Sequence, residues 1–524
     1  MTVVSTSPID GATLGTVPAT APERVGEEVR AAALVQPLWA QLRLVDRARY
    51  LRRAAQAVID EWEDLAELLV REGGRPRAEV ATMELLPAVD TLQWLGEAGP
   101  KILKPRRLPV SRTLFPLTRA RLRHEPLGVV GVLTPASEPF ATPLGDVAVA
   151  LMAGNAVVLA PSALAPLAAD RVLRIFTRAG IPEGLVRVLH GGPDVGRALV
   201  RTAVAQVRFT GSEEGGRDVE AARARALHRA AIDIGGHGTM LVLADADQER
   251  VTAGATWAAF AHAGQCGGSV KRAVVVEERT DRFVSDVAAR AAALRLGDPR
   301  DPTIEIGPPL AADRVDAVRK LLDDAVAAGA TLHTGGVVDE VAGLAGPALA
   351  PAILTGVPED SALRDSAVPG PVLIVDTVRD EDEAIARANA QPGTGLGVSV
   401  WTDNRHRGTR IASQLRAGMV WGNDHRVTRA APQLPWGAIG GAGIGRARGA
   451  EALLASCEPK LVTWDPPGGR AAWWAPYDEA TVAAWQALAQ LRSARDRDRE
   501  DALRTGVGPL ARVAARTART ARRS

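Results

Sequence analysis

Apolar and polar positions change their spacing along the chain, and these changes mark segments of different secondary structure. From about residue 23 to residue 99, apolar residues recur at helical spacing, most clearly in 48–59 and 62–70. This periodicity predicts amphipathic helices with solvated polar faces. In 108–125 the pattern becomes a rough alternation with arginines two residues apart, which predicts two strands with one polar face.

Short apolar runs then alternate with helical segments. The runs at 127–133, 156–159, 185–189 and 207–211 predict strands, with helices at 143–152 and 171–179 between them. A second series extends from about residue 241 to residue 420, with a predicted strand at 272–276, a helix at 314–328 and a strand at 395–401. Such alternation is typical of βαβ units and predicts an α/β fold with parallel sheets.

Length, composition and charge set broad bounds. A chain of 524 residues is too long for one hydrophobic core, so we expect two or three domains. Hydrophobic residues make up 46% and charged residues 24%, as in ordinary soluble globular proteins. The net charge of +2 gives no general attraction to polyanions, so we expect neither a membrane nor a nucleic acid as a partner.

The two cysteines, Cys266 and Cys457, are far apart in the sequence. They indicate neither a disulfide framework nor the ligand spacing of a metal site, so we expect no metal. The first residues contain neither the basic nor the apolar region of a signal peptide. Together these features predict a protein of the reducing cytoplasm.

Cys266 lies in the segment Gly264-Gln265-Cys266-Gly267-Gly268. A thiol in a glycine-rich turn is typical of a cysteine nucleophile, because glycines let a substrate approach closely. Free cysteine is also among the most buried residue types and often only fills space. The segment alone leaves both interpretations open.

A glycine turn follows the predicted strand 207–211 and opens a helix at Gly211-Ser212-Glu213-Glu214-Gly215-Gly216. Backbone N–H groups at such a helix start can face a phosphate. Glycines in these turns also serve tight packing, and two acidic residues would resist an anion. A phosphate site and a packing role therefore both remain open.

In this order, the motifs resemble those of the aldehyde dehydrogenase superfamily over about residues 1–465. The segment 125–135 resembles the family's strand into its Pro-Trp-Asn loop, and 153–162 resembles its Ala-Gly-Asn segment. Further similar motifs are Phe209-Thr210-Gly211-Ser212, Gly235-Gly236, Gly370-Pro371-Val372, Asn423 and Gly443-Ile444-Gly445-Arg446.

The resemblance implies an aldehyde-dehydrogenase-like α/β fold with two parallel-sheet αβα domains and a small β element for oligomerisation. On this basis we expect a dinucleotide-binding domain at 1–106 and 125–235, a catalytic domain at 236–450 and bridging strands at 107–124 and 451–466. Residues 467–524 are expected to form a helical C-terminal extension, whose basic tail carries six arginines and no acid from Arg504 onward. The resemblance also implies a homo-oligomer, either a dimer or a tetramer.

The resemblance implies oxidation of an aldehyde to a carboxylate with NAD or NADP. In the family a cysteine attacks the aldehyde, a side-chain amide stabilises the oxyanion and a glutamate activates water. Here the nucleophile position is Gly267, with Cys266 one residue early. The general-base position is Asp233, and the oxyanion position is Ser137.

The resemblance also implies a cofactor site at Thr134, Pro135, Gly192, Gly211, Ser212, Gly216 and Gly235. Four family contacts are replaced by smaller or less polar residues. The lysine and glutamate that hold the adenosine ribose are replaced by Ala160 and Ala163, and the two nicotinamide-ribose contacts by Ala367 and Pro369. We therefore expect weaker cofactor binding than in the family.

Two hypotheses follow for the activity. The chain could be a divergent dehydrogenase that uses Cys266, or a catalytically degenerate structural or regulatory subunit, for example one paired with an active relative. Losing a covalent nucleophile can cost about 10⁶ in kcat, and losing one oxyanion donor costs roughly 10²–10³. Adjacent Cα atoms lie about 3.8 Å apart, so Cys266 cannot simply replace a nucleophile at 267. The coincidence of these replacements favours the degenerate subunit.

Overall fold

The computed structural model describes residues 1–524 except 112–114, 116–117, 237, 366–367, 369, 391–394, 426–429, 466–470, 472, 476 and 522–524. The described chain forms two compact units. One contains residues 1–104 and 124–458, and the other contains residues 105–123 and 459–524. Among the described residues, no helix combines the length and the apolar character needed to cross a membrane.

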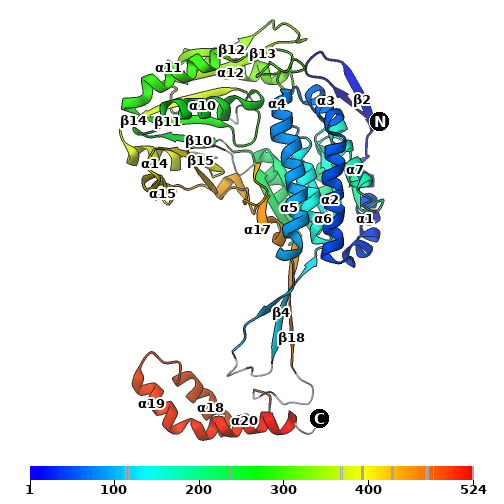
Figure 1. The fold of residues 1–524 in the computed structure, drawn as a ribbon, viewed down its shortest axis with the longest axis vertical. Coiled ribbons are helices and arrows are strands. Elements are labelled where there is room, and N and C mark those ends of the chain that lie inside the picture. The colour runs from blue at the N-terminus through cyan, green and yellow to red at the C-terminus, as the bar shows by residue number, and fades with distance from the viewer. Residues whose placement is uncertain are drawn as a thin grey trace. The chain divides into compact units, whose positions relative to one another are not determined.

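The first unit begins with a hairpin of β1 (Thr2–Thr6) and β2 (Thr13–Pro18), followed by a group of helices. The helices are α1 (Val25–Ala40), α2 (Leu44–Asp60), α3 (Trp62–Gly73), α4 (Arg77–Glu79), a π-helix at Val80–Leu85 and α5 (Leu86–Ile102). In α2 the buried residues include Ala48, Leu51, Ala55 and Val58, which lie on one face of the helix. Helices α2 and α5 lie side by side (Figure 1). The helical prediction for 23–99 is confirmed.

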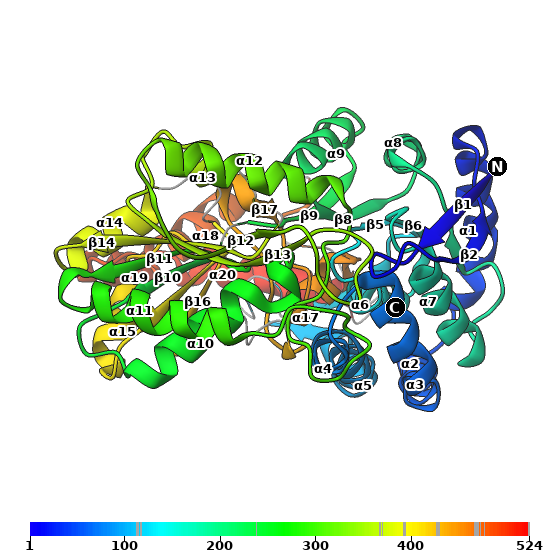
Figure 2. The ribbon, with the colours of Figure 1, turned by 90° about the horizontal axis from the view of Figure 1, so that it is seen from above.

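A six-stranded sheet follows, in the order β17-β9-β8-β5-β6-β7. Its parallel strands are β5 (Val129–Thr134), β6 (Ala156–Pro161), β7 (Val186–Val188), β8 (Gln206–Gly211) and β9 (Arg229–Ile234). The connecting helices are α6 (Ala141–Ala153), α7 (Pro166–Arg178), α8 (Pro193–Arg201) and α9 (Glu213–Arg225). Helices α8 and α9 lie on one face of the sheet, and α6 and α7 lie on the other (Figure 2).

The second sheet of this unit has seven strands, in the order β12-β13-β14-β11-β10-β15-β16. These are β10 (Gly238–Val242), β11 (Val270–Val276), β12 (Thr331–Val338), β13 (Ala348–Thr355), β14 (Val372–Val378), β15 (Gly397–Trp401) and β16 (Met419–Gly422). Helices α10 (Gln248–Phe260) and α11 (Glu277–Ala293) pack on one face, and α12 (Asp313–Ala327) and α14 (Glu381–Asn389) pack on the other. The remaining helices are α13 (Ala362–Asp365), α15 (Arg405–Ala412) and α17 (Gly449–Ala455).

Each sheet departs from the predicted parallel arrangement at one edge strand. In the second sheet, β12 pairs antiparallel with β13, because a short connection joins them as a hairpin. In the first sheet, the short β17 (Gly443–Ile444) pairs antiparallel with β9. The remaining strands confirm the predicted α/β class. The predicted boundary between the dinucleotide and catalytic domains stays a prediction.

The second unit contains strands and a helical segment. Strands β3 (Arg106–Leu108), β4 (Arg119–Pro126) and β18 (Cys457–Trp464) form a three-stranded sheet in the order β18-β4-β3. The two strands predicted within 108–125 correspond to β3, which begins two residues earlier, and β4. Strand β18 lies within 451–466, where the resemblance implied a bridging strand, and a role of these strands in oligomerisation stays a prediction. Helices α18 (Glu479–Gln490), α19 (Asp496–Thr505) and α20 (Val507–Ala521) make up the C-terminal segment.

Candidate functional site

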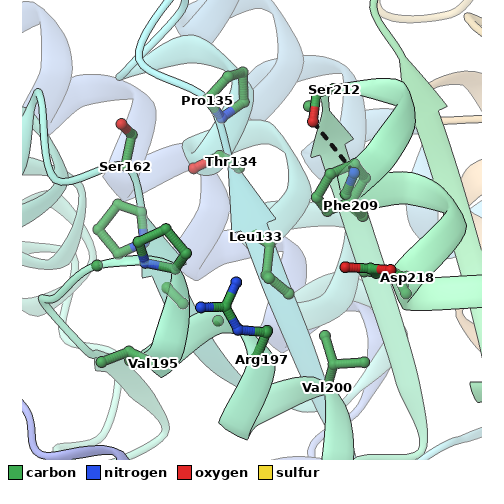
Figure 3. Close-up of a pocket in the computed structure, with 18 of the residues that line it drawn as sticks. Leu133, Thr134, Pro135, Ser162, Val195, Arg197, Val200, Phe209, Ser212 and Asp218 are labelled. Atoms are coloured by element: carbon green, nitrogen blue, oxygen red, sulfur yellow. Dashed lines mark hydrogen bonds between the residues drawn. The ribbon is translucent and has the colours of Figure 1, made fainter. Parts of the chain in front are cut away.

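A cavity of about 770 Å³ opens at the carboxyl ends of the parallel strands in the first sheet (Figure 3). Strand β5 ends at Thr134, β6 at Pro161 and β8 at Gly211, and all three residues line the cavity. Strands β6 and β8 flank β5 on opposite sides, so the chain order reverses at β5. In open α/β sheets, ligands bind at such switch points, and the volume suits a cofactor-sized ligand.

Five of the seven cofactor residues expected from the sequence line this cavity, namely Thr134, Pro135, Gly192, Gly211 and Ser212. The other two lie elsewhere. A Cβ on Gly216 would come within 2.9 Å of Ile234, so this glycine lets α9 pack closely on β9. A Cβ on Gly235 would lie 3.9 Å from the Cα of Gly267, which places Gly235 beside the nucleophile position.

The start of α9 is built to face the cavity. Ser212 is its N-cap, and its Oγ accepts a hydrogen bond from the backbone N–H of Gly215 at 3.2 Å. A Cβ on Gly211 would come within 2.5 Å of the Phe209 ring, so a larger residue there would require this ring to move. Glu213, which the sequence pattern suggested would resist an anion, forms an ion pair with Arg217 at 2.6 Å. The strand ends, the helix start and the glycines together form the kind of site that binds the pyrophosphate of a dinucleotide.

Two of the replaced family contacts, Ala160 and Ala163, also line the cavity. Their methyl groups offer no hydrogen bond to a ribose at this part of the wall. The other two, Ala367 and Pro369, lie outside the described residues.

The loop that carries Cys266 has an unusual backbone. His262 and Ala263 adopt left-handed conformations, with φ of 53° and 49°, and Gly264 follows with φ of 67°. Left-handed residues other than glycine cost roughly 1–2 kcal/mol each and persist only where the surroundings hold them. The backbone N–H of His262 donates to Glu79 Oε2 at 2.8 Å, which is one such restraint.

Buried and half-buried polar side chains hold the rest of this loop. Lys271 Nζ donates to the carbonyl oxygens of Gly264 and Gly370, both at 2.6 Å. Burial lowers the pKa of Lys271 to about 7, and the nearby Cys266 opposes this shift. Gln265 Oε1 accepts hydrogen bonds from the Leu310 N–H at 2.9 Å and from Arg314 Nη1 at 3.0 Å. The turn is therefore fixed by several contacts at once.

Cys266 is 6% exposed, and its sulfur faces Arg75. Arg75 Nη2 lies 3.7 Å from Cys266 Sγ and donates to the carbonyl oxygen of Ser137 at 2.5 Å. Arg75 Nη1 donates to Glu84 Oε1 at 3.0 Å in a buried ion pair. Cys266 does not line the nucleotide cavity. This cysteine packs against a buried ion pair.

Gly267 has different surroundings. A Cβ placed on it would meet no atom of the described residues within 4 Å, and its backbone φ is not in the left-handed region. A side chain at 267 would thus project into open space without strain. The position that the resemblance assigns to the nucleophile therefore has room for a side chain that glycine lacks.

Asp233, at the general-base position, is 8% exposed and accepts a hydrogen bond from Trp436 Nε1 at 3.0 Å. Burial raises the pKa of Asp233 to about 7, and Asp146 adds to this, whereas Trp436, Arg448 and Arg208 oppose it. A carboxyl group with a pKa near neutrality can exchange a proton at physiological pH. Asp233 lines two small cavities of about 10 and 20 Å³, and neither Cys266 nor Gly267 lines these cavities.

Arg75 thus contacts both Ser137 and Cys266 and brings these two residues together. Asp233 lines two small cavities that neither Ser137 nor Cys266 lines. Sequence reasoning missed Arg75, Lys271 and Arg314. Arg75 is 191 residues from Cys266 along the chain, so no local pattern could have linked them. Lys271 lies close to Cys266 in the sequence, but its buried position only becomes visible in the fold.

The chain belongs to the aldehyde dehydrogenase family, whose model matches residues 1–462. This confirms the resemblance, and the family's chemistry is NAD(P)-dependent oxidation of aldehydes. The chain is 32% identical to a 4,4'-diapolycopene aldehyde oxidase of Methylomonas sp. over 86% of its length and 84% of the relative's. It is also 32% identical to an NADP-dependent succinate-semialdehyde dehydrogenase of Deinococcus radiodurans, over 80% and 86%.

Solved structures give the same result for the fold. PnpE from Pseudomonas sp. WBC-3 superimposes with a TM-score of 0.85 at 30% identity, over 91% of this chain and 96% of that one. A structure of PnpE with nicotinamide adenine dinucleotide matches with a TM-score of 0.84 at 30% identity, over 89% and 94%. A putative aldehyde dehydrogenase of Burkholderia cenocepacia matches with a TM-score of 0.86 at 30% identity, over 91% and 96%.

Proposed function

We propose that this chain is a catalytically degenerate aldehyde dehydrogenase that holds a nucleotide without oxidising aldehydes. In this function it serves as a structural or regulatory subunit, in a homo-oligomer or paired with an active relative. The observation that carries the proposal is the open space at Gly267, where the attacking group of the family belongs. The cavity at the strand ends supports retained binding, and Ala160 and Ala163 support an affinity below that of active relatives.

The chemistry explains why this one position matters most. NAD(P), when bound, supplies the acceptor for a hydride, but the hydride leaves only after a nucleophile has added to the aldehyde carbon. Cys266 packs against Arg75, and its neighbour Gly267 faces the open space. Ser137 retains a hydroxyl at the oxyanion position, but losing one amide donor there still costs roughly 10²–10³ in kcat.

A divergent dehydrogenase that uses Cys266 is the second candidate. Two observations favour it. The cysteine has two basic neighbours, Arg75 and Lys271, and the pKa of Asp233 near 7 suits a general base. For this candidate the aldehyde would have to reach the sulfur of a residue that is only 6% exposed.

The decisive experiment restores the nucleophile. The purified chain is mixed with aliphatic and aromatic aldehydes and NAD or NADP, and the absorbance of the reduced nicotinamide is followed. We expect no turnover by the natural chain or by Cys266→Ser. We expect Gly267→Cys to gain a fast-alkylating thiol and a single-turnover burst, and Gly267→Cys with Ser137→Asn to be faster by roughly 10²–10³.

Gly268→Cys is the matched control. Gly268 is the next residue, but its φ is 78° and a Cβ there would approach Leu396 to 3.3 Å. We therefore expect Gly268→Cys to show neither a single-turnover burst nor turnover. Turnover by the natural chain that Cys266→Ser abolishes would refute the proposal and establish the second candidate.

A further inference from the structure

The charged residues that line the nucleotide cavity are strongly biased toward cations. They are Arg197, Arg201, Arg225, Arg314 and Asp218. The Arg314 side chain donates a hydrogen bond to Gln265, whereas the side chains of Arg201 and Arg225 form no hydrogen bond or ion pair with the described residues. Four arginines and one aspartate therefore line the cavity, which suits a ligand with several negative charges.

The strand end next to β5 lacks the group that selects NAD. In dinucleotide sites, an acidic residue near this position accepts a hydrogen bond from the ribose 2′-hydroxyl and repels a 2′-phosphate, whereas a nearby arginine accommodates that phosphate. After β6, the residues that line the cavity are Ser162, Ala163 and Leu164. None of them can repel an anion, and the Ser162 hydroxyl can donate to one.

Arg197 is the cation best placed to bind a phosphate. It lies on α8, and Figure 3 shows its guanidinium directed into the cavity near Leu133 and Val195. It forms an ion pair with Asp194 at 2.7 Å, and the two side chains are 51% and 76% exposed. An exposed ion pair of this kind contributes little stability, so Arg197 can exchange Asp194 for a phosphate at little cost. A guanidinium binds phosphate through two parallel hydrogen bonds.

We propose that the cavity selects NADP over NAD, and that Arg197, with Ser162, binds the 2′-phosphate of the adenosine ribose. The inference rests on the proposed function only in that the cavity holds a dinucleotide, and it requires no turnover. Arg201 and Arg225 attract the ligand's phosphates in general. Arg197 supplies the discrimination between the two dinucleotides.

Calorimetric titration of the full chain with NAD and with NADP tests the inference. We expect NADP to bind about tenfold more tightly, because hydrogen bonds between a guanidinium and a phosphate are charge-assisted and strong. We expect Arg197→Gln to weaken NADP about tenfold and to change NAD by less than about twofold. Adenosine 2′,5′-bisphosphate and ADP, used as smaller probes, should show the same preference and the same loss.

Arg217→Gln is the matched control. Arg217 lies on α9, pairs with Glu213 and does not line the cavity, so its loss should leave both titrations unchanged. Equal or tighter binding of NAD, absence of binding by both dinucleotides, or an equal loss for both in Arg197→Gln would overturn the inference. Turnover by the natural chain would refute only the proposed lack of catalysis, so the two failures are distinguishable.

Discussion

The nucleotide cavity and the Cys266 loop belong to the same compact unit but are held together differently. The cavity is formed by strand ends, helix starts and small or apolar side chains such as Ala160 and Ala163. The Cys266 loop is held by contacts of polar side chains, among them Arg75, Glu84 and Lys271, and its backbone is strained at His262 and Ala263. The binding region is thus a cavity shaped by strand ends and helix starts, whereas the reaction region, the surroundings of Cys266, is a network of interacting polar side chains.

This difference indicates that the contacts that shape a site can be retained when the side chain that would react there is lost. Contacts fix the turn around Gly264 and Gln265, whereas under the proposed function the side chain that this turn would position, at residue 267, is absent. A dense network around Cys266 is therefore no sign that Cys266 reacts. If the contrast is correct, substitutions in the reaction region will mainly change stability, and substitutions around the cavity will mainly change nucleotide binding.

The largest expected effect comes from Arg75→Met. It removes the cation from a buried pair with Glu84 and leaves the carboxylate buried without it. Breaking a buried pair in this way costs about 3–5 kcal/mol. Urea unfolding of Arg75→Met should show a loss of this size in the free energy of unfolding.

Arg77→Met is the control for Arg75→Met. Arg77 pairs with Glu63 on the surface, where such pairs contribute about 0–1 kcal/mol. If the two variants lost similar amounts of stability, the Cys266 region would not be the side-chain network that we describe.

Asp233→Asn tests the same region through pH. The folded pKa of Asp233 is about 7, well above its unfolded value, so between these values the folded chain holds a proton that the unfolded chain has lost. The natural chain therefore loses stability as pH rises toward 7, by at most about 1.4 kcal/mol per pH unit. An asparagine at position 233 cannot ionise, so the stability of the variant relative to the natural chain should rise between pH 5 and pH 7 and level off above pH 8.

Unfolding of Asp233→Asn and the natural chain across that pH range measures the difference directly. The oxygen of the introduced amide can still accept the Trp436 hydrogen bond, so the variant isolates the charge. A pH-independent difference would mean that Asp233 is ionised throughout, and its carboxylate would then be solvated or paired.

The sequence predicted the fold and much of the cavity because both depend on local patterns. Strand ends such as Gly211 and helix starts such as Ser212 are neighbours in the chain, so their spacing indicates their meeting point. The contacts of Cys266 could not be predicted in this way. Arg75 reaches it from a loop after α3, and Asp233 meets Trp436 across 203 residues, so both contacts depend on the packing of distant elements.

Gly216 and Gly235 illustrate the same limit at the cavity. Both belong to glycine motifs for which the family resemblance implied nucleotide contact, and neither lines the cavity. Gly216 faces Ile234 and Gly235 faces Gly267, on sides of their elements that the motif alone does not specify. A glycine has no side chain to show which neighbour requires it, so only the fold separates packing glycines from binding glycines.

The smallest expected effect is that of Ser212→Ala, which tests the cavity side. Removing the N-cap of α9 should cost about 1 kcal/mol of stability. Asp247→Ala removes the equivalent cap from α10, where Asp247 Oδ1 accepts from the Arg250 N–H at 2.8 Å, and should cost about the same.

Because Ser212 lines the cavity and Asp247 does not, only Ser212→Ala should also weaken nucleotide binding. NAD and NADP should weaken alike, since Ser212 lies at the start of α9 and Arg197 lies on α8, and a change in their ratio would place the 2′-phosphate at α9 instead of α8.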